Sequence, residues 1–579
     1  MFRNQLANSG PLFALLASLL AVVAATGWLL IPPLRFRSER RPQPPQANLS
    51  DLESVSKRLD EALLSSGTAG KSEASQEFQG DNDSRAFSGL HLQSSLPVAG
   101  RIPILDWARR VSLGLNGTIP SLEEIRQLES QPLATREAWW LEHLLADRRT
   151  SDHLAERLGR AIVGVENGPF ILYRRRRFIA WLSDQLSSNR PYDEVVRELI
   201  ASEGIWTEKP AVNFVTVTTD IDGTGQPSPI RLAARTSRSF LAMRIDCLEC
   251  HDDFLGTIQI GSAEGLRGGQ QADFHRLAAF FSTARNSLAG VRDDLEAEPY
   301  RFTLLDEETA TEFQPGVPLH PNLLLAAGSP RQRLAMWLTH PSNQQFARAT
   351  VNRVWAIVFG QPLVVPIDDI PPTADVPRAL DLLADDFVKH GYDLHRLLRL
   401  MAGSEAMRAR GRVPDANTDP GAWSWDEYPA VRLRPEQVAH SLLQSSTFTT
   451  LDTTAHVLRR LIGSAQENEF VNRYGDFGEN EFDPRSETVT QRLLVLNGNL
   501  VREQLEQGFG SPARLAALAP NPETALEILF LVTLTRRPHE DERTRLVPSL
   551  QAAWAGEREL RLQDLYWALL NSAEFASAR

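Results

Sequence analysis

The chain of 579 residues is long enough to bury at least two hydrophobic cores, so it is expected to form two or more domains. Hydrophobic residues make up 42% of it and charged residues 23%, as in ordinary globular proteins. The formal net charge of -12 excludes a nucleic-acid binder built on a broad basic face, and two cysteines are too few for a disulfide scaffold.

An uncharged apolar segment spans residues 11–34 and reads PLFALLASLLAVVAATGWLLIPPL. It is long enough to cross a bilayer as a helix, with Trp28 near one end as an interfacial aromatic residue. A cleaved signal peptide is the alternative, because Val23-Ala24-Ala25 suits a small-residue cleavage site. The apolar run continues through Ile31, so we expect residues 1–34 to form an uncleaved transmembrane anchor that binds the protein to a membrane.

Residues 35–100 are rich in Pro, Ser and Gln, a composition that predicts a disordered linker. One helix is expected within it, because Ser50 and Glu53 form a capping-box pattern ahead of Val55, Leu59 and Leu63.

Helical periodicity begins after the linker, and residues 101–290 are expected to form a first, predominantly helical domain. Ser121 with Glu124 three residues later predicts the start of one helix. Another is expected to run through RLAARTSRSFLAMRIDCLEC, residues 231–250, and a third over residues 272–284. The best strand candidate is the segment 213–219.

Both cysteines of the chain lie in Cys247-Leu248-Glu249-Cys250-His251. C-x-x-C-H is the attachment pattern of c-type haem, in which two thiols form thioethers and the histidine is an axial iron ligand. A zinc site is less well supported, because it needs about four ligands and the chain has no second cysteine pair. A redox-active thiol pair, a plain disulfide and a chance occurrence of the pattern remain open.

We therefore expect Cys247 and Cys250 to bind haem c covalently, with His251 as the axial ligand and electron transfer to a redox partner protein as the function. The sixth ligand is unknown; His275, on the helix that follows, is a candidate, and a surface position is the alternative. The basic run Arg174–Arg177 fits either an anion site, for example for haem propionates, or a solvated turn.

The two indications of location disagree. Arg35, Arg37, Arg40 and Arg41 follow the apolar segment and only Arg3 precedes it, so the positive-inside rule keeps the globular part in the cytoplasm. Covalent haem attachment takes place outside the cytoplasmic membrane. We expect a single-pass protein with its globular part in the periplasm.

An acidic and proline-rich stretch, residues 291–320, predicts a second linker, and residues 321–579 a second helical domain. Helices are expected over residues 331–340, 345–359, 381–390 and 394–401, and in the last sixty residues over 523–533, 540–556 and 562–575. The sequence contains no phosphate loop, H-E-x-x-H or G-x-S-x-G motif. The expected fold class is thus mainly α, with a transmembrane helix, a disordered linker and two predominantly helical domains.

Several blocks in this order resemble the planctomycete cytochrome c-like domain followed by its companion C-terminal domain, both functionally uncharacterised. The first domain resembles that family in RRVSLGLNGTIPSLEEI, NRPYDEVVRELIA, FLAMRIDCLECHDDF and FHRLAAFF. The second does so in RLAMWLTHPSNQQFARATVNRVWAIVFGQPLVVPIDDI, LADDFVKHGYDLHRLLRLMAGSEAMR and TVTQRLLVLNGNLV. The resemblance covers most of residues 102–579 and implies a haem-binding region at Cys247, Cys250 and His251.

The chain departs from the family pattern at two places. The family reads C-x-x-C-H-D-H where this chain has Asp253 in place of the second histidine, and AIVGVENGPF replaces a tryptophan-rich stretch. In the second domain, Asn352, Arg353 and Trp355 stand in the most specific block. There, a structural ion pair of Arg353 with Asp368 or Asp369 beside a buried tryptophan is favoured over an active site.

Three functions follow as hypotheses. The first is a membrane-tethered haem c protein that transfers electrons in the cell envelope. The second is an envelope enzyme that acts on a complex carbohydrate through its second domain, with no residues assignable to catalysis. The third is a non-haem structural envelope protein.

Overall fold

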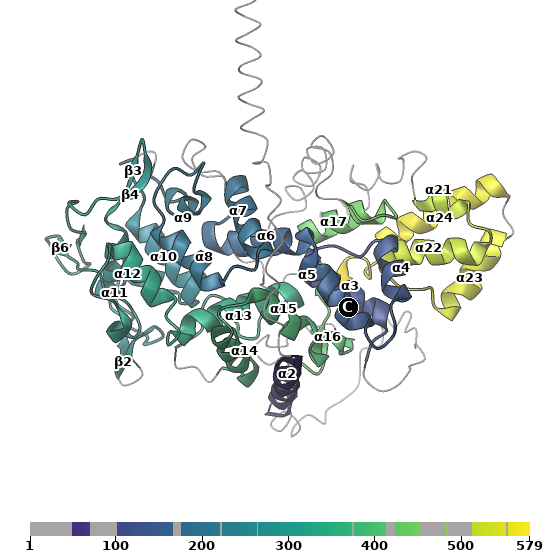
Figure 1. The fold of residues 1–579 in the computed structure, drawn as a ribbon, viewed down its shortest axis with the longest axis horizontal. Coiled ribbons are helices and arrows are strands. Elements are labelled where there is room, and N and C mark those ends of the chain that lie inside the picture. Colours follow the sequence, from purple (N-terminus) through teal and green to yellow (C-terminus); the bar gives the residue numbers. More distant parts are fainter. Residues whose placement is uncertain are drawn as a thin grey trace, which may run out of the picture.

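The computed structural model describes the chain over residues 49–69, 101–165, 175–220, 223–262, 265–372, 376–412, 423–451, 482, 512–551 and 554–578. Helices dominate this part of the chain, and its strands form small two-stranded sheets (Figure 1). This confirms the mainly helical fold predicted from the sequence.

The N-terminal helix α2 (Leu49–Ala69) lies where the capping-box pattern predicted a helix within the linker. Its apolar face, which includes Val55, Leu59 and Leu63, is buried against α14 (Arg378–Lys389), α15 (Leu394–Ala402) and α16 (Glu405–Arg408). A segment inside the predicted linker therefore belongs to the folded body.

The predicted fold class needs a correction at the membrane anchor. Among the described residues, no helix combines the length and the apolar character that a membrane crossing requires. The long N-terminal helix α2, for example, carries charged residues along its whole length, Asp51, Lys57 and Glu61 among them. The segment 11–34, for which the anchor was predicted, lies outside the described residues, and the described helices do not support a transmembrane anchor.

The first half of the body begins with α3 (Ile104–Asn116) and continues through short amphipathic helices. These are α4 (Leu122–Ser130), α5 (Arg136–Ala146), α6 (Arg148–Val163), α7 (Arg175–Ser187), α8 (Tyr192–Ala201), α9 (Asn213–Thr216), α10 (Pro229–Leu241) and α11 (Gln271–Ala278). Two β-hairpins flank α11: β1 (Gln259–Ser262) pairs with β2 (Gly265–Gly268), and β3 (Ala284–Ser287) with β4 (Gly290–Asp293).

The predicted strand over residues 213–219 is wrong, because its first part forms helix α9 after the 3-10 turn η1 (Pro210–Val212). Asn213, Phe214, Val215 and Thr216 are all buried. Alternation of polar and apolar residues signals a strand only when one face meets solvent, and here tertiary packing buries the polar residues of α9 as well as the apolar ones.

The second half contains α12 (Pro330–Leu338), α13 (Gln344–Phe359), α14 and α15, and ends with α17 (Pro435–Ser445), α21 (Pro512–Ala517), α22 (Pro522–Leu534), α23 (Glu540–Gln551) and α24 (Ala555–Leu570). A helix is found in each segment where one was predicted for residues 331–401, which confirms those predictions. Near the C-terminus the predicted bounds 540–556 and 562–575 are wrong, because α23 ends at Gln551 and α24 runs from Ala555 to Leu570. The stretch QRLLVLNGNLV lies outside the described residues.

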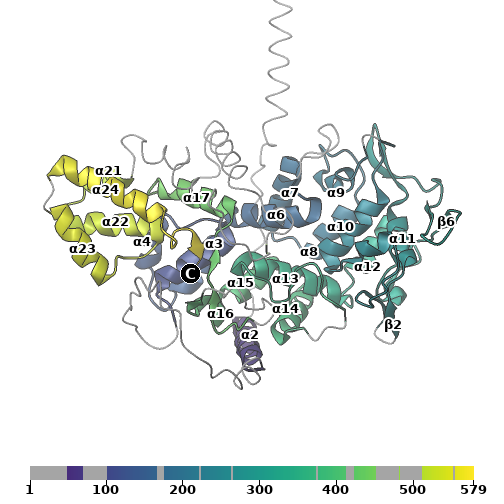
Figure 2. The same cartoon turned by 180° about the vertical axis from the view of Figure 1, so that it is seen from behind.

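Helix α3 joins the two halves. It contacts α5 and α6 on one side and α13 and α16 on the other. The close approach to α13 requires a glycine, since a Cβ atom at Gly114 would lie 2.5 Å from the carbonyl oxygen of Val358. Figures 1 and 2 show α3 and α13 in the middle of the molecule, with α10–α12 towards one end and α21–α24 at the other.

Candidate functional site

The C-x-x-C-H motif occupies an exposed turn after α10. That helix ends at Ala242, which adopts a left-handed conformation with φ of 47°, and the 3-10 turn η2 (Ile245–Glu249) follows. The single helix predicted over residues 231–250 is thus wrong: the chain breaks ahead of the motif. Cys247, Cys250 and His251 are exposed, and the cysteines are free thiols, whereas Leu248 between them is fully buried.

Contacts with other segments of the same chain explain why α10 ends before the motif. The backbone N–H of Ile370 donates to the carbonyl oxygen of Ala242 at 2.7 Å. Arg244 forms an ion pair with Asp368, in which two guanidinium nitrogens lie 2.9 and 2.6 Å from Oδ1. Arg238 also holds Asp246, at 3.0 and 2.6 Å. Asp368 and Ile370 lie more than 120 residues further along the chain, so no local pattern predicts these two contacts.

Residues of helix α11 form hydrogen bonds with the turn. The carbonyl oxygen of Glu249 accepts hydrogen bonds from Gln271 Nε2 at 2.9 Å and from His275 Nε2 at 3.1 Å. The backbone N–H of Gln271 donates to Asp252 Oδ1 at 2.7 Å. Glu249, before Cys250, and Asp252, after it, are therefore both hydrogen bonded to α11.

His275 is fully buried. Burial lowers its pKa, so the ring is neutral: Nε2–H donates to Glu249, and Nδ1 accepts from the Tyr300 hydroxyl at 3.0 Å. Its ring also stacks on Phe302 with 3.7 Å between centroids. Both nitrogens of this candidate sixth ligand are thus hydrogen bonded within the protein, where they position the motif.

His251 has one ring nitrogen available. Its Nδ1 lies 2.7 Å from the carbonyl oxygen of Asp252, to which Nδ1–H donates. This bond leaves Nε2 with its lone pair, the arrangement usual for a histidine that binds a metal. The next side chains, Phe254 and Leu255, are 82% and 87% exposed, and the Phe254 ring stacks with His251.

Asp253, which replaces the second histidine of the family pattern, organises the following loop. Its carboxylate accepts hydrogen bonds from the backbone N–H groups of Ile258 at 2.5 Å and Leu255 at 3.1 Å, and from the Thr257 hydroxyl at 3.3 Å. These bonds, the one from Ile258 foremost, lower the pKa of Asp253. The departure from the pattern thus has a structural role in this chain.

The block around Asn352 serves packing. Asn352 Oδ1 accepts from the backbone N–H groups of Leu363 at 2.9 Å and Val364 at 3.0 Å, and Trp355 stacks on Phe359 in the core. Arg353 is buried in the same helix. An ion pair of Arg353 with Asp368 or Asp369 was predicted. At Asp368 the prediction is wrong, because the Asp368 carboxylate pairs with Arg244 and Arg238 from the first half.

Comparison with known protein families finds two matches in this chain. Residues 92–286 match the family PSCyt2, a protein of unknown function (DUF1549), and residues 330–457 match PSD1, a protein of unknown function (DUF1553). The chain carries this planctomycete-type pair of uncharacterised domains. No curated protein and no solved structure matches it.

The basic run was one further candidate. Arg175, at the start of α7, forms a bidentate ion pair with Glu156 at 3.0 and 2.7 Å and donates to the carbonyl oxygen of Gly164 at 3.1 Å. It ties α7 to α6. Arg174 lies outside the described residues.

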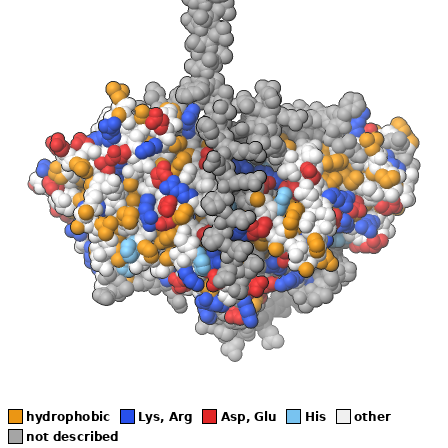
Figure 3. Space-filling model, in the orientation of Figure 1, with side chains coloured by type: hydrophobic (Ala, Val, Ile, Leu, Met, Phe, Trp, Pro, Cys, Tyr) orange, Lys and Arg blue, Asp and Glu red, His pale blue; other side chains and the backbone are white. Residues whose placement is uncertain are grey.

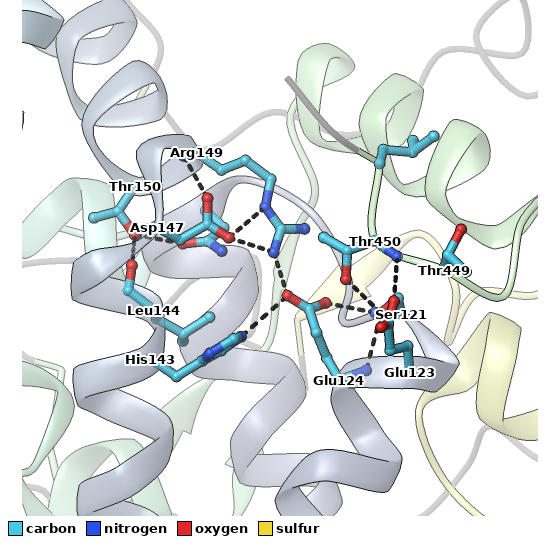
Figure 4. Close-up of polar contacts among 12 residues, drawn as sticks. Ser121, Glu123, Glu124, His143, Leu144, Asp147, Arg149, Thr150, Thr449 and Thr450 are labelled. Carbon is cyan, nitrogen blue, oxygen red and sulfur yellow. Dashed lines mark hydrogen bonds and ion pairs between the residues drawn. The ribbon is translucent and has the colours of Figure 1, made fainter. Parts of the chain in front are cut away.

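A buried polar cluster around Glu124 joins α4, α5 and α6 (Figure 4). The backbone N–H of Ser121 donates to Glu124 at 2.8 Å, which confirms the predicted capping box, and Arg149 and His143 also contact the Glu124 carboxylate. Burial raises the pKa of Glu124, but hydrogen bonds from His143, Ser121 and Arg149 and the Arg149 charge outweigh it and hold that pKa at about 2. Every group has a partner, so the cluster is structural.

Sequence reasoning missed one group with metal-ligand chemistry. Ligand atoms of Asp51, Asp386 and His390 lie within 4.8 Å of one another. Arg396 occupies this site: its guanidinium lies 2.8 Å from both Asp51 and Asp386. A fixed cation already neutralises the carboxylates, so the group is an ion-pair network that fastens α2 to the second half.

Proposed function

We propose that this protein binds one haem c through Cys247, Cys250 and His251 and transfers electrons to a partner protein in the cell envelope. The observation that carries the proposal is the arrangement of the turn: both thiols and the imidazole are exposed together on a backbone fixed to α11. When bound, haem supplies a one-electron redox centre.

The side chains at the turn fit this group. The thiols of Cys247 and Cys250 are free and exposed, as thioether formation requires. The hydrogen bond of His251 Nδ1 to the backbone orients the ring and leaves Nε2 for iron. Phe254 and Leu255 present exposed apolar surface beside His251, and an apolar cofactor bound at the turn would gain free energy by burying it.

The deciding experiment uses protein made in a host with c-type haem maturation. We expect a haem stain that survives denaturing electrophoresis, and loss of the stain in the double variant Cys247→Ser, Cys250→Ser. The variant His251→Ala is expected to lose the low-spin absorption bands, whereas His539→Ala, which removes an exposed histidine elsewhere, is expected to keep them.

Two results would contradict the proposal. One is a colourless wild-type protein from a host in which a control c-type cytochrome matures. The other is retention of the low-spin bands by His251→Ala. A colourless protein with a disulfide between Cys247 and Cys250 would instead indicate a thiol redox pair, which the spacing also permits.

A further inference from the structure

A polar cavity lies at the junction of α3 with the C-terminal segment, apart from the C-x-x-C-H turn. It has a volume of about 230 Å³. Its walls come from α3 and the residues just before it, from Gly411, from the end of α22 and the segment after it, and from the segment after α24. The lining residues that carry or can carry a charge are Asp106, Arg109, Arg110, Arg536, His539 and Glu574. The C-terminal part of this wall lies beyond both family matches, which end at residues 286 and 457.

Arg536 forms a fixed part of the wall. It makes bidentate ion pairs with Glu574, at 2.6 and 2.9 Å, and with Glu542, at 2.8 and 2.9 Å. Although burial raises the pKa of Glu574, the hydrogen bonds and charge of Arg536 outweigh it, so the pKa lies below its ordinary value. Glu574 is therefore ionised at neutral pH.

The two arginines of α3 are likewise used in building the cavity. Arg109 donates to the carbonyl oxygens of Thr533 at 3.0 Å and Phe575 at 3.1 Å. Arg110 donates to the carbonyl oxygen of Met407 at 3.1 Å and lies over the Tyr428 ring at 4.0 Å. Both guanidinium groups stay in the walls and contribute positive charge to the cavity.

Asp106 differs from its neighbours. It is half-buried in the cavity wall that it shares with Glu574 and the three arginines, and no hydrogen bond to its side chain is found among the described residues. Burial, followed by the Glu574 charge, raises its pKa. Because the Asp106 carboxylate lines the cavity without a donor from the described residues, its oxygens can accept hydrogen bonds from a ligand placed there.

The charges around the cavity restrict the ligand. A negatively charged ligand would be repelled by the carboxylates of Asp106 and Glu574, and a positively charged ligand by the three guanidinium groups. A neutral molecule avoids both penalties, and Ile102 and Leu534 offer apolar contact beside the polar groups. We propose that this cavity binds a small neutral polyhydroxyl molecule whose hydroxyl groups donate hydrogen bonds to Asp106. The proposal is independent of haem binding.

The test is a titration of the full chain with myo-inositol and with glucose, in which ligand-observed NMR and calorimetry measure binding. Gluconate and glucosamine serve as the negatively and positively charged analogues. We expect one of the neutral polyols to bind, and the charged analogues to bind more weakly. Asp106→Ala is expected to weaken binding of that polyol about tenfold or more, the loss of a hydrogen bond to a charged group. Asp541→Ala, which removes an exposed carboxylate outside the cavity, is the matched control and should bind as the wild type does.

The pH dependence of polyol binding to the wild-type protein is a second test, and it needs no variant. Protonation of Asp106 removes the charged acceptor, so polyol binding is expected to weaken as the pH falls below neutral and through the raised pKa of that carboxyl. The proposal is overturned if neither polyol binds, if a charged analogue binds as tightly, or if binding is insensitive both to Asp106→Ala and to acid.

Discussion

At the scale of single residues, Glu124 makes the clearest contribution to stability. It is 2% exposed, and its partners hold its pKa at about 2 against an ordinary value of 4.5. A depressed pKa in the folded state stabilises the fold above the unfolded pKa, and this contribution disappears as the pH falls from 4.5 towards 2. The shift corresponds to about 3 kcal/mol of unfolding free energy at neutral pH.

We therefore expect Glu124→Gln to lower the free energy of unfolding at neutral pH and to make it less dependent on acid than in the wild type. Urea unfolding at neutral pH and at about pH 3 measures both effects. Glu123→Gln alters the neighbouring, exposed carboxylate and is the control. Parallel pH profiles for wild type and Glu124→Gln would contradict the assignment.

Sequence could reveal only part of such sites. The bond between Ser121 and Glu124 spans three residues, so a local pattern predicted it correctly. The Glu124 partners Arg149 and His143 lie 25 and 19 residues away, and nothing in the spacing indicates them. For His275 the sequence suggested a haem ligand or a surface residue, but the side chain is buried beside the motif. Its position could not be predicted, because its two hydrogen-bond partners, Glu249 and Tyr300, belong to separate segments of the chain.

At the scale of elements, periodicity located helices but not what they contact. The spacing of apolar residues in α2 predicted which face is buried. It did not predict that this face packs on α14, which lies more than 300 residues away in the chain. The break before the motif was missed for the same reason, because it depends on Asp368 and Ile370. Local patterns thus identify elements, and long-range contacts decide where they end.

The docking of α2 can be tested with one side chain. Leu59 is fully buried against the second half, so Leu59→Ala is expected to cost about 2–5 kcal/mol of the free energy that holds α2 in place. Limited proteolysis should then cut within residues 49–69 faster than in the wild type. Lys57→Ala changes an exposed residue of the same helix and should leave the rate unchanged. Equal cleavage rates for Leu59→Ala and wild type would show that α2 is not bound.

At the scale of the whole molecule, the two matched regions share one core. Buried residues from Val55 to Ala578 form a single hydrophobic cluster. Tyr192 of the first region stacks on Phe346 of the second, 6.1 Å between centroids, and the backbone N–H of Tyr192 donates to the carbonyl oxygen of Tyr392 at 3.2 Å. Figure 3 shows side chains of both charges interspersed on the surface that covers this core.

A cut between the regions should therefore leave them together. A protease site placed at the exposed residues Thr309 and Ala310, in the loop between β5 (Arg301–Phe302) and β6 (Thr311–Glu312), divides the chain while sparing its helices. The two pieces are expected to elute together in native buffer and to separate in denaturant, because the shared core is apolar and does not depend on the covalent link. The uncut protein is the control for elution volume. Pieces that separate natively and keep their helical circular dichroism would instead define two independent domains, and the ion pair of Arg244 with Asp368 would then be a contact between domains that fold alone.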